Sequence, residues 1–185
     1  MKHRHEELLY SYMDDPQVIE DLKRIRDLGL TQTCIAAGYV RNRVWDKLHG
    51  YVALTPLNDI DVIYYDPGNT LEERDYHLEQ LLNRGQINRH WSVKNQARMH
   101  ERNGDPPYAS AEDAMRYWPE TATAVGIYMD VQDVMHTVAP FGLDDLFEMR
   151  VKKSPYFRNT TAFRVRVFQK EWLDTWPLLI MDEQR

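Results

Sequence analysis

Residues 56–66 read Pro-Leu-Asn-Asp-Ile-Asp-Val-Ile-Tyr-Tyr-Asp, and this stretch decides the fold. Asp59 and Asp61 stand on either side of one isoleucine, and the run Val-Ile-Tyr-Tyr that follows is rich in strand formers. We therefore predict a strand over residues 59–65. Side chains two positions apart in a strand point to the same face, so both carboxylates are expected to project together.

Two converging carboxylates repel each other unless they share a proton or bind a cation. Hard divalent ions such as Mg²⁺ or Mn²⁺ take carboxylate oxygens and share their remaining positions with water and phosphates. Asp59 and Asp61 are therefore candidate metal ligands and catalytic residues for phosphoryl or nucleotidyl transfer. The alternative is that both acids are solvated turn residues in front of a strand.

A second candidate feature lies upstream, where residues 33–37 predict a short strand that ends at Gly38. A helix is predicted to follow over residues 40–48. Glycine between a strand and a helix lets backbone N–H groups approach a phosphate closely, and arginines in the first turns would neutralise its charge. The candidate nucleotide-binding residues here are Gly38, Arg41, Asn42 and Arg43. An ordinary tight turn with surface arginines is the alternative.

Length and composition limit the class of protein. The chain has 185 residues with a formal net charge of −6 and an apolar fraction of 43%, which fits one globular domain over residues 1–185 and argues against a general nucleic-acid coat protein. A single cysteine, Cys34, excludes an internal disulfide. The sequence contains neither a membrane-span pattern nor a signal-peptide core, so we expect a cytoplasmic location and no membrane partner.

Helical patterns occupy both ends of the chain. Residues 1–29 predict N-terminal helices, with Asp15 as an N-cap and Pro16 at the first helical position. Thr70 begins a Thr-Leu-Glu-Glu pattern that resembles a capping box. Residues 160–176 favour a helix capped by one of two adjacent threonines, within a C-terminal helical segment over residues 150–185.

This C-terminal segment is also basic. Residues 149–170 contain no acid and seven Lys or Arg residues, which are Arg150, Lys152, Lys153, Arg158, Arg164, Arg166 and Lys170. In an otherwise acidic chain, this asymmetry indicates either a basic wall for a nucleotide or nucleic acid, or a solvated helix face paired with the acidic N-terminal helices.

Five blocks of the sequence, in order, resemble a bacterial family of nucleotidyltransferase-like proteins within the DNA polymerase β superfamily. The blocks cover roughly residues 25–176 and read GYVRNRVWD, LNDIDVIYYD, WSVKNQARMH, WPETATAV and APFGLDDLF. The resemblance implies an α/β (α+β) nucleotidyltransferase fold with a mixed β-sheet flanked by helices. By position, Gly38 matches the glycine of the superfamily, and Asp59 and Asp61 match its paired metal ligands.

The chain departs from the superfamily pattern in three ways. Tyr39 stands where a serine usually helps to hold a phosphate, and the gap from Gly38 to Asp59 is longer than usual. Active members carry a third carboxylate on a later strand, but residues 91–96 contain none. Lys94 in this strand is a further candidate for nucleotide binding, and Asp130 is a candidate replacement for the missing acid.

Together these features predict a metal-dependent nucleotidyltransferase that moves a nucleoside monophosphate from an NTP to an unidentified acceptor. The acceptor could be a small molecule, a protein or RNA. The alternative is a degenerate member of the fold that binds a nucleotide or a protein partner without turnover. The intact pair of acids favours the enzyme, whereas the missing serine and third acid favour the binding protein.

Overall fold

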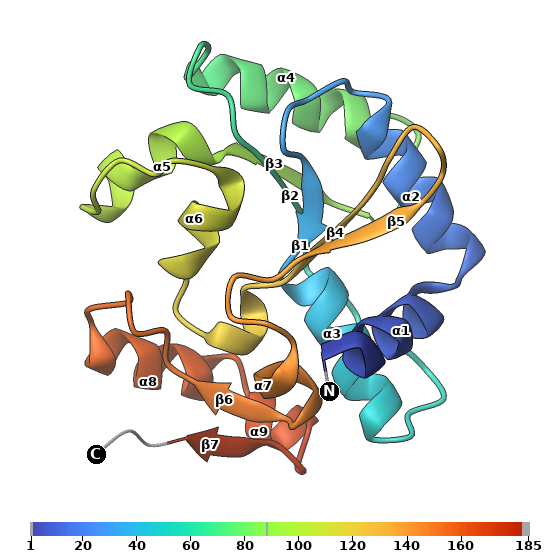
Figure 1. Ribbon diagram of the computed structural model, residues 1–185, viewed down its shortest axis with the longest axis vertical. Coiled ribbons are helices and arrows are strands. Elements are labelled where there is room, and N and C mark those ends of the chain that lie inside the picture. The colour runs from blue at the N-terminus through green and yellow to red at the C-terminus, as the bar shows by residue number, and fades with distance from the viewer. Residues whose placement is uncertain (1, 88, 183–185) are drawn as a thin grey trace.

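The computed structural model describes residues 2–87 and 89–182 as a central sheet with helices packed around it (Figure 1). The strands of this sheet are β1 (Cys34–Ala36), β2 (Ile60–Tyr64), β3 (Trp91–Asn95), β4 (Gly126–Met129) and β5 (Met135–Val138). The helices before β4 are α1 (Lys2–Met13), α2 (Pro16–Arg26), α3 (Gly38–Leu48), α4 (Glu72–Asn83), α5 (Gln96–Asn103), α6 (Ala111–Arg116) and the 3₁₀ helix η1 (Thr121–Thr123). After β5 come α7 (Asp144–Phe147), β6 (Arg150–Lys152), α8 (Thr160–Gln169), α9 (Trp172–Thr175) and β7 (Ile180–Asp182).

The sheet is mixed, and its strand order is β3-β2-β1-β4-β5. β2 and β3 run parallel, whereas β1 is antiparallel to both β2 and β4, and β5 is antiparallel to β4. The parallel step is possible because α4 provides the crossover between β2 and β3. The predicted mixed sheet flanked by helices is therefore confirmed.

One face of the sheet is mostly apolar and contributes to the main core. Ile35, Val62, Val93 and Ile127 have no exposed surface, and they belong to one buried cluster with side chains of α2, α3 and α4. The alternation of β2 explains this, because Ile60, Val62 and Tyr64 all project to the helix side. The opposite face carries Asp61.

A row of small residues crosses that opposite face. Strand pairing places Asp61 between Ser92 of β3 and Ala36 of β1, and Ala36 is paired in turn with Gly126 of β4. Gly126 is required by close packing, since a Cβ there would lie 2.6 Å from Sγ of Cys34. Because the residues beside Asp61 have small side chains, there is open space next to its carboxylate on this face of the sheet.

One of these two predicted helix caps is confirmed and the other is wrong. Asp15 is the N-cap of α2 as predicted, and its carboxylate accepts hydrogen bonds from the next helical N–H groups. Thr70 is not the cap of α4, which begins after Leu71 without a side-chain cap. Asn95 explains the shift, since its amide holds the carbonyl of Asn69 and so keeps Thr70 in the preceding loop.

The C-terminal segment differs more from its prediction. α8 is capped by Asn159 rather than by Thr160 or Thr161, because the Asn159 side chain accepts a hydrogen bond from the N–H of Ala162. The predicted helical segment over residues 150–185 also contains β6 and β7, which pair in parallel as a second small sheet. Residues 183–185 lie outside the described part of the chain.

Across residues 2–87 and 89–182, every helix is either too short or too polar to cross a membrane. The helices pack through tertiary contacts instead. Trp45 of α3 is fully buried and meets Trp172 and Trp176 edge-on, with ring centroids 5.6 and 5.2 Å apart. These contacts attach the C-terminal segment to the helix that begins at Gly38.

Asp46 fixes the long loop between α3 and β2. This carboxylate is 1% exposed and accepts three hydrogen bonds, from the N–H of Thr55 (2.7 Å), the hydroxyl of Thr55 (2.6 Å) and the indole N–H of Trp176 (2.8 Å). Four residues further on, the same loop delivers Asp59. The extra chain length between Gly38 and Asp59 is therefore an anchored loop.

Replacing Asp46 by alanine should lower the free energy of unfolding by about 3 kcal/mol, because three donors lose a buried charged acceptor. Urea denaturation of the Asp46→Ala variant measures the change. Asp174→Ala is the matched control, since Asp174 is exposed and forms no ion pair with a described residue, and its effect should stay within about 0.5 kcal/mol. Equal effects in both variants would contradict the anchoring role.

Candidate active site

Asp61 is the central side chain of the candidate site. It lies in β2 on the face with the small residues, whereas Asp59 is exposed and stands just before the strand begins. Burial, together with the negative charge of Asp59, raises the pKa of Asp61 to about 6. Arg41, Arg166 and Lys170 oppose this shift with positive charge. The two acids are thus close enough to repel each other, as expected for a cation site.

The turn into α3 leaves backbone donors free. Ala37 has a φ of 56°, and no side chain caps the helix. The N–H groups of Gly38 and Tyr39 have no acceptor among the described residues. This helix end is a suitable position for a phosphate, because free N–H groups and the helix dipole both favour an anion there.

The Tyr39 hydroxyl, in contrast, is committed to a buried carboxylate. Its ring is 5% exposed, and its hydroxyl donates to Oδ2 of the fully buried Asp21 at 2.6 Å. Arg89 contacts the same carboxylate through two nitrogens. The residue that replaces the usual serine is therefore part of the packing between α2 and α3.

Arg41 lies inside the protein, with 6% of its surface exposed. Its guanidinium donates to Thr123 Oγ1 (3.0 Å) and Asn42 Oδ1 (2.7 Å) and lies 4.2 Å from the ring centroid of Trp172. Burial lowers the pKa of Arg41 to about 10, while the nearby charge of Glu120 raises it. Arg41 thus places positive charge behind the carboxylates without exposing its nitrogens.

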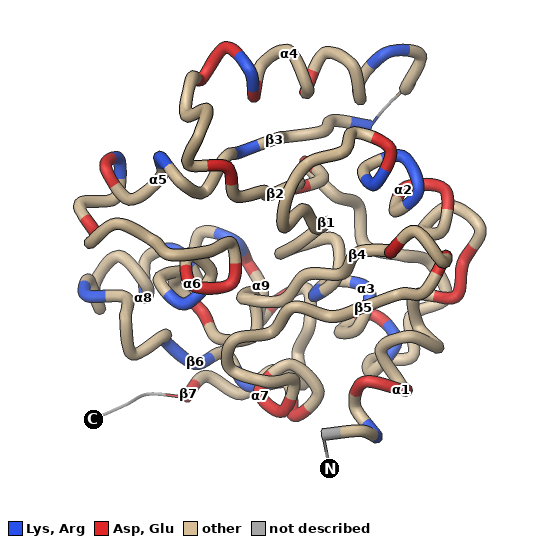
Figure 2. Tube along the Cα trace, turned by 45° about the horizontal axis from the view of Figure 1, so that its top comes forward, with Lys and Arg blue, Asp and Glu red and all other residues tan. Residues whose placement is uncertain are grey.

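Arg166 of α8 lines the same hollow as Asp61. Its Nε donates to Oε1 of Glu120 at 2.8 Å, and its two terminal nitrogens donate to no described residue. Glu120 is fully buried, so it holds the guanidinium at a fixed point. Sequence reasoning did not single out Arg166, although the acid-free run over residues 149–170 was the signal that contained it. Figure 2 shows Lys and Arg along this segment around α8 and β6.

Lys94 lies on the Asp61 face of the sheet, since it is paired with Ile63, two residues after Asp61. Its ammonium contacts Oε1 of Glu79 in α4 at 2.6 Å. It lines the same hollow as Asp61, at the outer strand of the sheet. Lys94 is thus near the site and partly neutralised by its partner.

The third carboxylate has no counterpart here. Within the described ranges, no group of three or more His, Cys, Asp or Glu side chains is placed to hold a metal ion. Ser92 stands opposite Asp61 in β3, and Asp130 lies at the end of β4, where it accepts a hydrogen bond from His136 at 2.7 Å. The suggestion that Asp130 replaces the missing acid is therefore wrong, because β4 carries it to a different hollow.

Two hollows of about 250 Å³ each lie beside the acid pair. Asp61 lines the first, which we call the inner hollow, with Ala37, Ile63, Lys94, Gln96, Met99, Asn103, Trp118, Pro119, Thr123 and Arg166. Asp59 lines the second, the outer hollow, with Tyr39, Asn42, Arg43, Asp46, Leu54, Thr55, Pro56, Leu57, Ile60, Arg89 and His90. Of the predicted nucleotide-binding residues, Lys94 lines the inner hollow and Asn42 and Arg43 line the outer one, whereas Gly38 and Arg41 line neither.

Comparison with known proteins agrees with this geometry. Residues 23–181 match a protein family described as nucleotidyltransferase. The chain belongs to this nucleotidyltransferase family. Membership assigns it to the transferases that use NTPs. No curated protein matches the chain.

Solved structures similar to this nucleotidyltransferase extend the comparison. One is a protein whose NMR structure is reported to reveal a CCA-adding enzyme head domain, with 33% identity, a TM-score of 0.84, and coverage of 97% of this chain and 96% of that one. A tRNA nucleotidyltransferase complexed with a primer tRNA and an incoming ATP analog shares the fold at 19% identity and a TM-score of 0.53, covering 85% of this chain and 45% of that one. The CCA-adding enzyme of Thermotoga maritima complexed with tRNA shares it at 14% identity and a TM-score of 0.55, covering 96% and 42%. The nucleotidyltransferase described here spans less than half of these two enzymes.

The raised pKa of Asp61 predicts a defined pH dependence of stability. Asp61 ionises near 3.8 in the unfolded chain and near 6 in the folded one, so its ionisation costs the fold stability as the pH rises through this window. Asp61→Asn removes that cost. The free energy of unfolding of the variant relative to wild type should rise between about pH 4 and about pH 7 and then stay constant, as measured by urea denaturation.

Asp66→Asn is the control with the opposite sign. The hydrogen bond from Arg74 lowers the pKa of Asp66, so its ionised form contributes stability above 3.8 and loses it as the pH falls. Its variant should be less stable than wild type at neutral pH and approach wild type in acid. A pH-independent difference for Asp61→Asn would contradict the raised pKa of Asp61 that burial and the charge of Asp59 produce.

Proposed function

We propose that this chain is a metal-dependent nucleotidyltransferase that transfers a nucleoside monophosphate from an NTP to a hydroxyl group of an RNA acceptor. The observation that carries the proposal is Asp61 in one hollow with the guanidinium of Arg166, whose terminal nitrogens donate to no described residue, while the charge of Asp59 acts on Asp61 from the neighbouring hollow. Acids and an open cation in this arrangement suit a metal-bound triphosphate.

The residues present fit a divalent ion. Asp61 carries an unfavourable negative charge that a cation would relieve, and Asp59 adds a second carboxylate next to it. Mg²⁺ is commonly bound by one or two carboxylates together with substrate phosphates, so a third acid is not needed for binding. Asp59 and Asp61 would hold Mg²⁺ or Mn²⁺, and the ion would supply charge neutralisation on the phosphates.

The inner hollow is assigned to the NTP. The terminal nitrogens of Arg166 would hold the triphosphate, and the free N–H groups of Gly38 and Tyr39 add donors at the helix end. Lys94 adds positive charge at the edge of the same space, and the charge of Lys170 also acts on Asp61. Arg41 supports the site from inside through its charge.

The reaction then follows from positions and charges. The acceptor hydroxyl oxygen forms a bond to the α-phosphorus, and the bond from this phosphorus to the oxygen of the β-phosphate breaks. Pyrophosphate is the leaving group, and the guanidinium of Arg166 neutralises part of its negative charge. The proton of the hydroxyl passes to solvent water, because no third carboxylate of the described residues stands at the pair. Most of the rate enhancement would come from positioning and charge neutralisation.

The choice of RNA as acceptor rests on the neighbours of this fold. The structures that share it include enzymes complexed with a primer tRNA and with ATP or CTP. The acid-free C-terminal segment offers this chain a surface of matching charge.

A second candidate function is nucleotide binding without turnover. The specific observation that favours it is the missing third carboxylate, together with the buried Tyr39 in the place of a phosphate-binding serine. Both candidates require an NTP in the inner hollow. They differ only in whether a product forms.

Titration with ATP, GTP, CTP and UTP, with and without Mg²⁺ or Mn²⁺, tests the shared step. Arg166→Gln should weaken metal-dependent NTP binding about 10- to 100-fold, because charge-assisted hydrogen bonds to phosphate are lost. Arg158→Gln is the matched control, since Arg158 is exposed on the same segment and lines neither hollow. Equal losses in the two variants would show general charge attraction and contradict the assigned contact.

Transfer of label from an α-phosphate-labelled NTP to short RNA with a free 3′-hydroxyl distinguishes the two candidates. Product that forms with wild type and disappears with Asp61→Asn supports the enzyme. NTP binding that needs Asp61, without product on RNA, favours the second candidate.

A further inference from the structure

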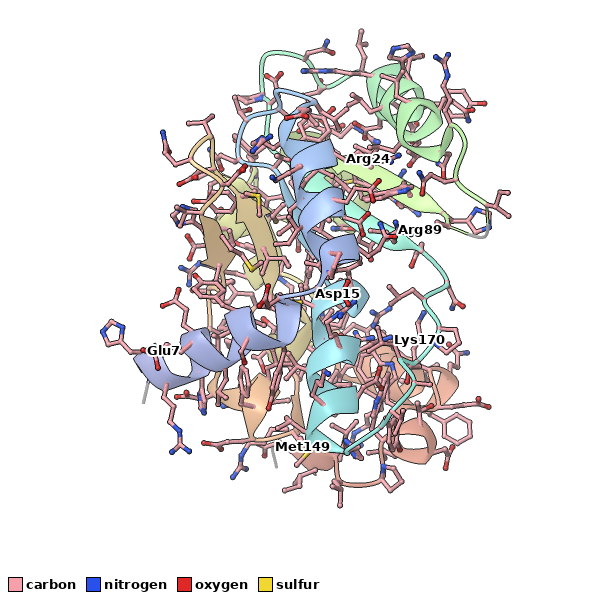
Figure 3. The ribbon with its side chains drawn as sticks, turned by 90° about the vertical axis from the view of Figure 1, so that its right-hand side faces the viewer. Glu7, Asp15, Arg24, Arg89, Met149 and Lys170 are labelled. Atoms are coloured by element: carbon pink, nitrogen blue, oxygen red, sulfur yellow. The ribbon has the colours of Figure 1, made fainter. Side chains whose placement is uncertain are left out.

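The outer hollow is built differently from the inner one. Its side chains come from α3, from the loop that leads to β2, and from the two residues before β3, which are Arg89 and His90. Asp59 is the member of the acid pair that reaches it. Figure 3 shows Asp15, Arg89 and Lys170 on one side of the molecule, along the loop between α3 and β2.

The guanidinium of Arg89, which lines this hollow, is already paired with a carboxylate. Arg89 donates to both oxygens of Asp21, which is fully buried, and its guanidinium lies 5.3 Å from the ring centroid of Trp91. The hydroxyl of Tyr39 completes the same network. Because Arg89 is paired with a carboxylate, it does not give the outer hollow the excess positive charge that a triphosphate requires.

Two donors beside Arg89 are less fully paired, namely the amide nitrogen of Asn42 and the guanidinium of Arg43, which forms one longer ion pair with Asp15. Asn42 is only 9% exposed, its Oδ1 accepts from Arg41, and its amide nitrogen donates to no described residue. The side chain of Arg43 is 13% exposed, and its nearest carboxylate is Asp15, at 3.4 Å. An amide donor and a guanidinium on adjacent residues of α3 suit a singly charged phosphate ester.

The opposite wall is apolar. Leu54, Pro56 and Leu57 line it, and the anchor between Asp46 and Thr55 holds this part of the loop in place. Leu57 also lies against Gly38, where a Cβ would be 3.7 Å from its Cδ2. Such a wall suits the face of a sugar or a base, whereas Asp59 marks the side toward the inner hollow.

We propose that the outer hollow binds the acceptor, as a hydroxyl-bearing phosphate ester about the size of a nucleoside monophosphate. Arg43 and Asn42 hold the phosphate, Leu54 and Leu57 contact the apolar part, and the hydroxyl lies at Asp59. This inference rests on the proposed function. It places the donor and the acceptor on opposite sides of the acid pair, so the hydroxyl oxygen bonds to the α-phosphorus as pyrophosphate leaves, and the hydroxyl proton goes to water.

The assignment is tested by measuring how tightly two variants bind nucleoside monophosphates and how tightly they bind NTPs. CMP and AMP are titrated as probes of the outer hollow, and ATP or CTP with Mg²⁺ as probes of the inner one. Arg43→Gln should weaken CMP and AMP about 10-fold and change NTP binding less than about 2-fold. Arg166→Gln should have the reverse effect.

Asp15→Asn is the control for the fold. It removes the ion pair with Arg43 and keeps an N-cap for α2, so the affinity for CMP should stay within about 2-fold of wild type. The assignment is overturned if CMP and AMP fail to bind to the wild type, if they bind as tightly to Arg43→Gln as to the wild type, or if Arg43→Gln weakens the monophosphates and the NTPs equally. An NTP that fails to bind at all would instead count against the proposed function, because the monophosphate titrations are made without it.

Titration with a short RNA shows whether the phosphate ester belongs to a free nucleotide or to the end of a polynucleotide. A 12-nucleotide RNA with a free 3′-hydroxyl that binds more tightly than CMP, and loses this advantage in Arg43→Gln, supports a polynucleotide end as the occupant. Binding of CMP with no gain for the RNA supports a free nucleotide as the occupant. The same RNA carrying a 3′-phosphate is the matched control for recognition of the terminal hydroxyl.

Discussion

The contact between Arg41 and Trp172 is the interaction on which the site depends. The guanidinium is buried and lies 4.2 Å from the indole ring, so a residue of the first turn of α3 is joined to a residue near the C-terminus. A buried cation is costly unless hydrogen bonds and anions compensate it. Thr123 and Asn42 accept its hydrogen bonds, and Glu120 supplies the nearest negative charge.

This requirement explains much of the surrounding structure. The charge of Glu120 acts on Arg41, and its carboxylate accepts a hydrogen bond from Arg166, whose guanidinium lines the same hollow as Asp61. Trp172 is held in turn by Trp45, and Trp176 binds the carboxylate that anchors the loop to Asp59. The two acids, the helix end at Gly38 and the C-terminal segment are therefore parts of one network. Positive and negative side chains alternate within this network. A metal-bound anion would fit at its surface.

Local patterns in the sequence identified the elements that carry the acids. The alternation around Asp61, the strand that ends before Gly38 and the cap at Asp15 are decided by neighbouring residues, and the structure shows all three. The role of Arg41 was not accessible in this way, because its burial depends on Trp172, 131 positions later in the chain. Arg166 was missed for the same reason. Its position depends on Glu120, and that pairing is long-range.

The separation of the two hollows is also a tertiary property. Arg43 and Asn42 follow Gly38 directly, so sequence alone groups them with the phosphate-binding turn. The helix turns their side chains toward the outer hollow, whereas Ala37 and Asp61 face the inner one. The strand pairing of Ser92 with Asp61 likewise shows which residue stands where a third acid was expected.

Paramagnetic broadening by Mn²⁺ in NMR spectra shows directly whether Asp59 and Asp61 hold a divalent ion beside a nucleotide. If they do, broadening should be centred on the backbone amides next to the pair, in β1, the first turn of α3 and the start of β2. Addition of ATP should strengthen the broadening at the same amides. Broadening centred on another acidic region, such as Asp144 and Asp145, or no effect of Mn²⁺ with ATP present, would show that the pair does not hold the ion.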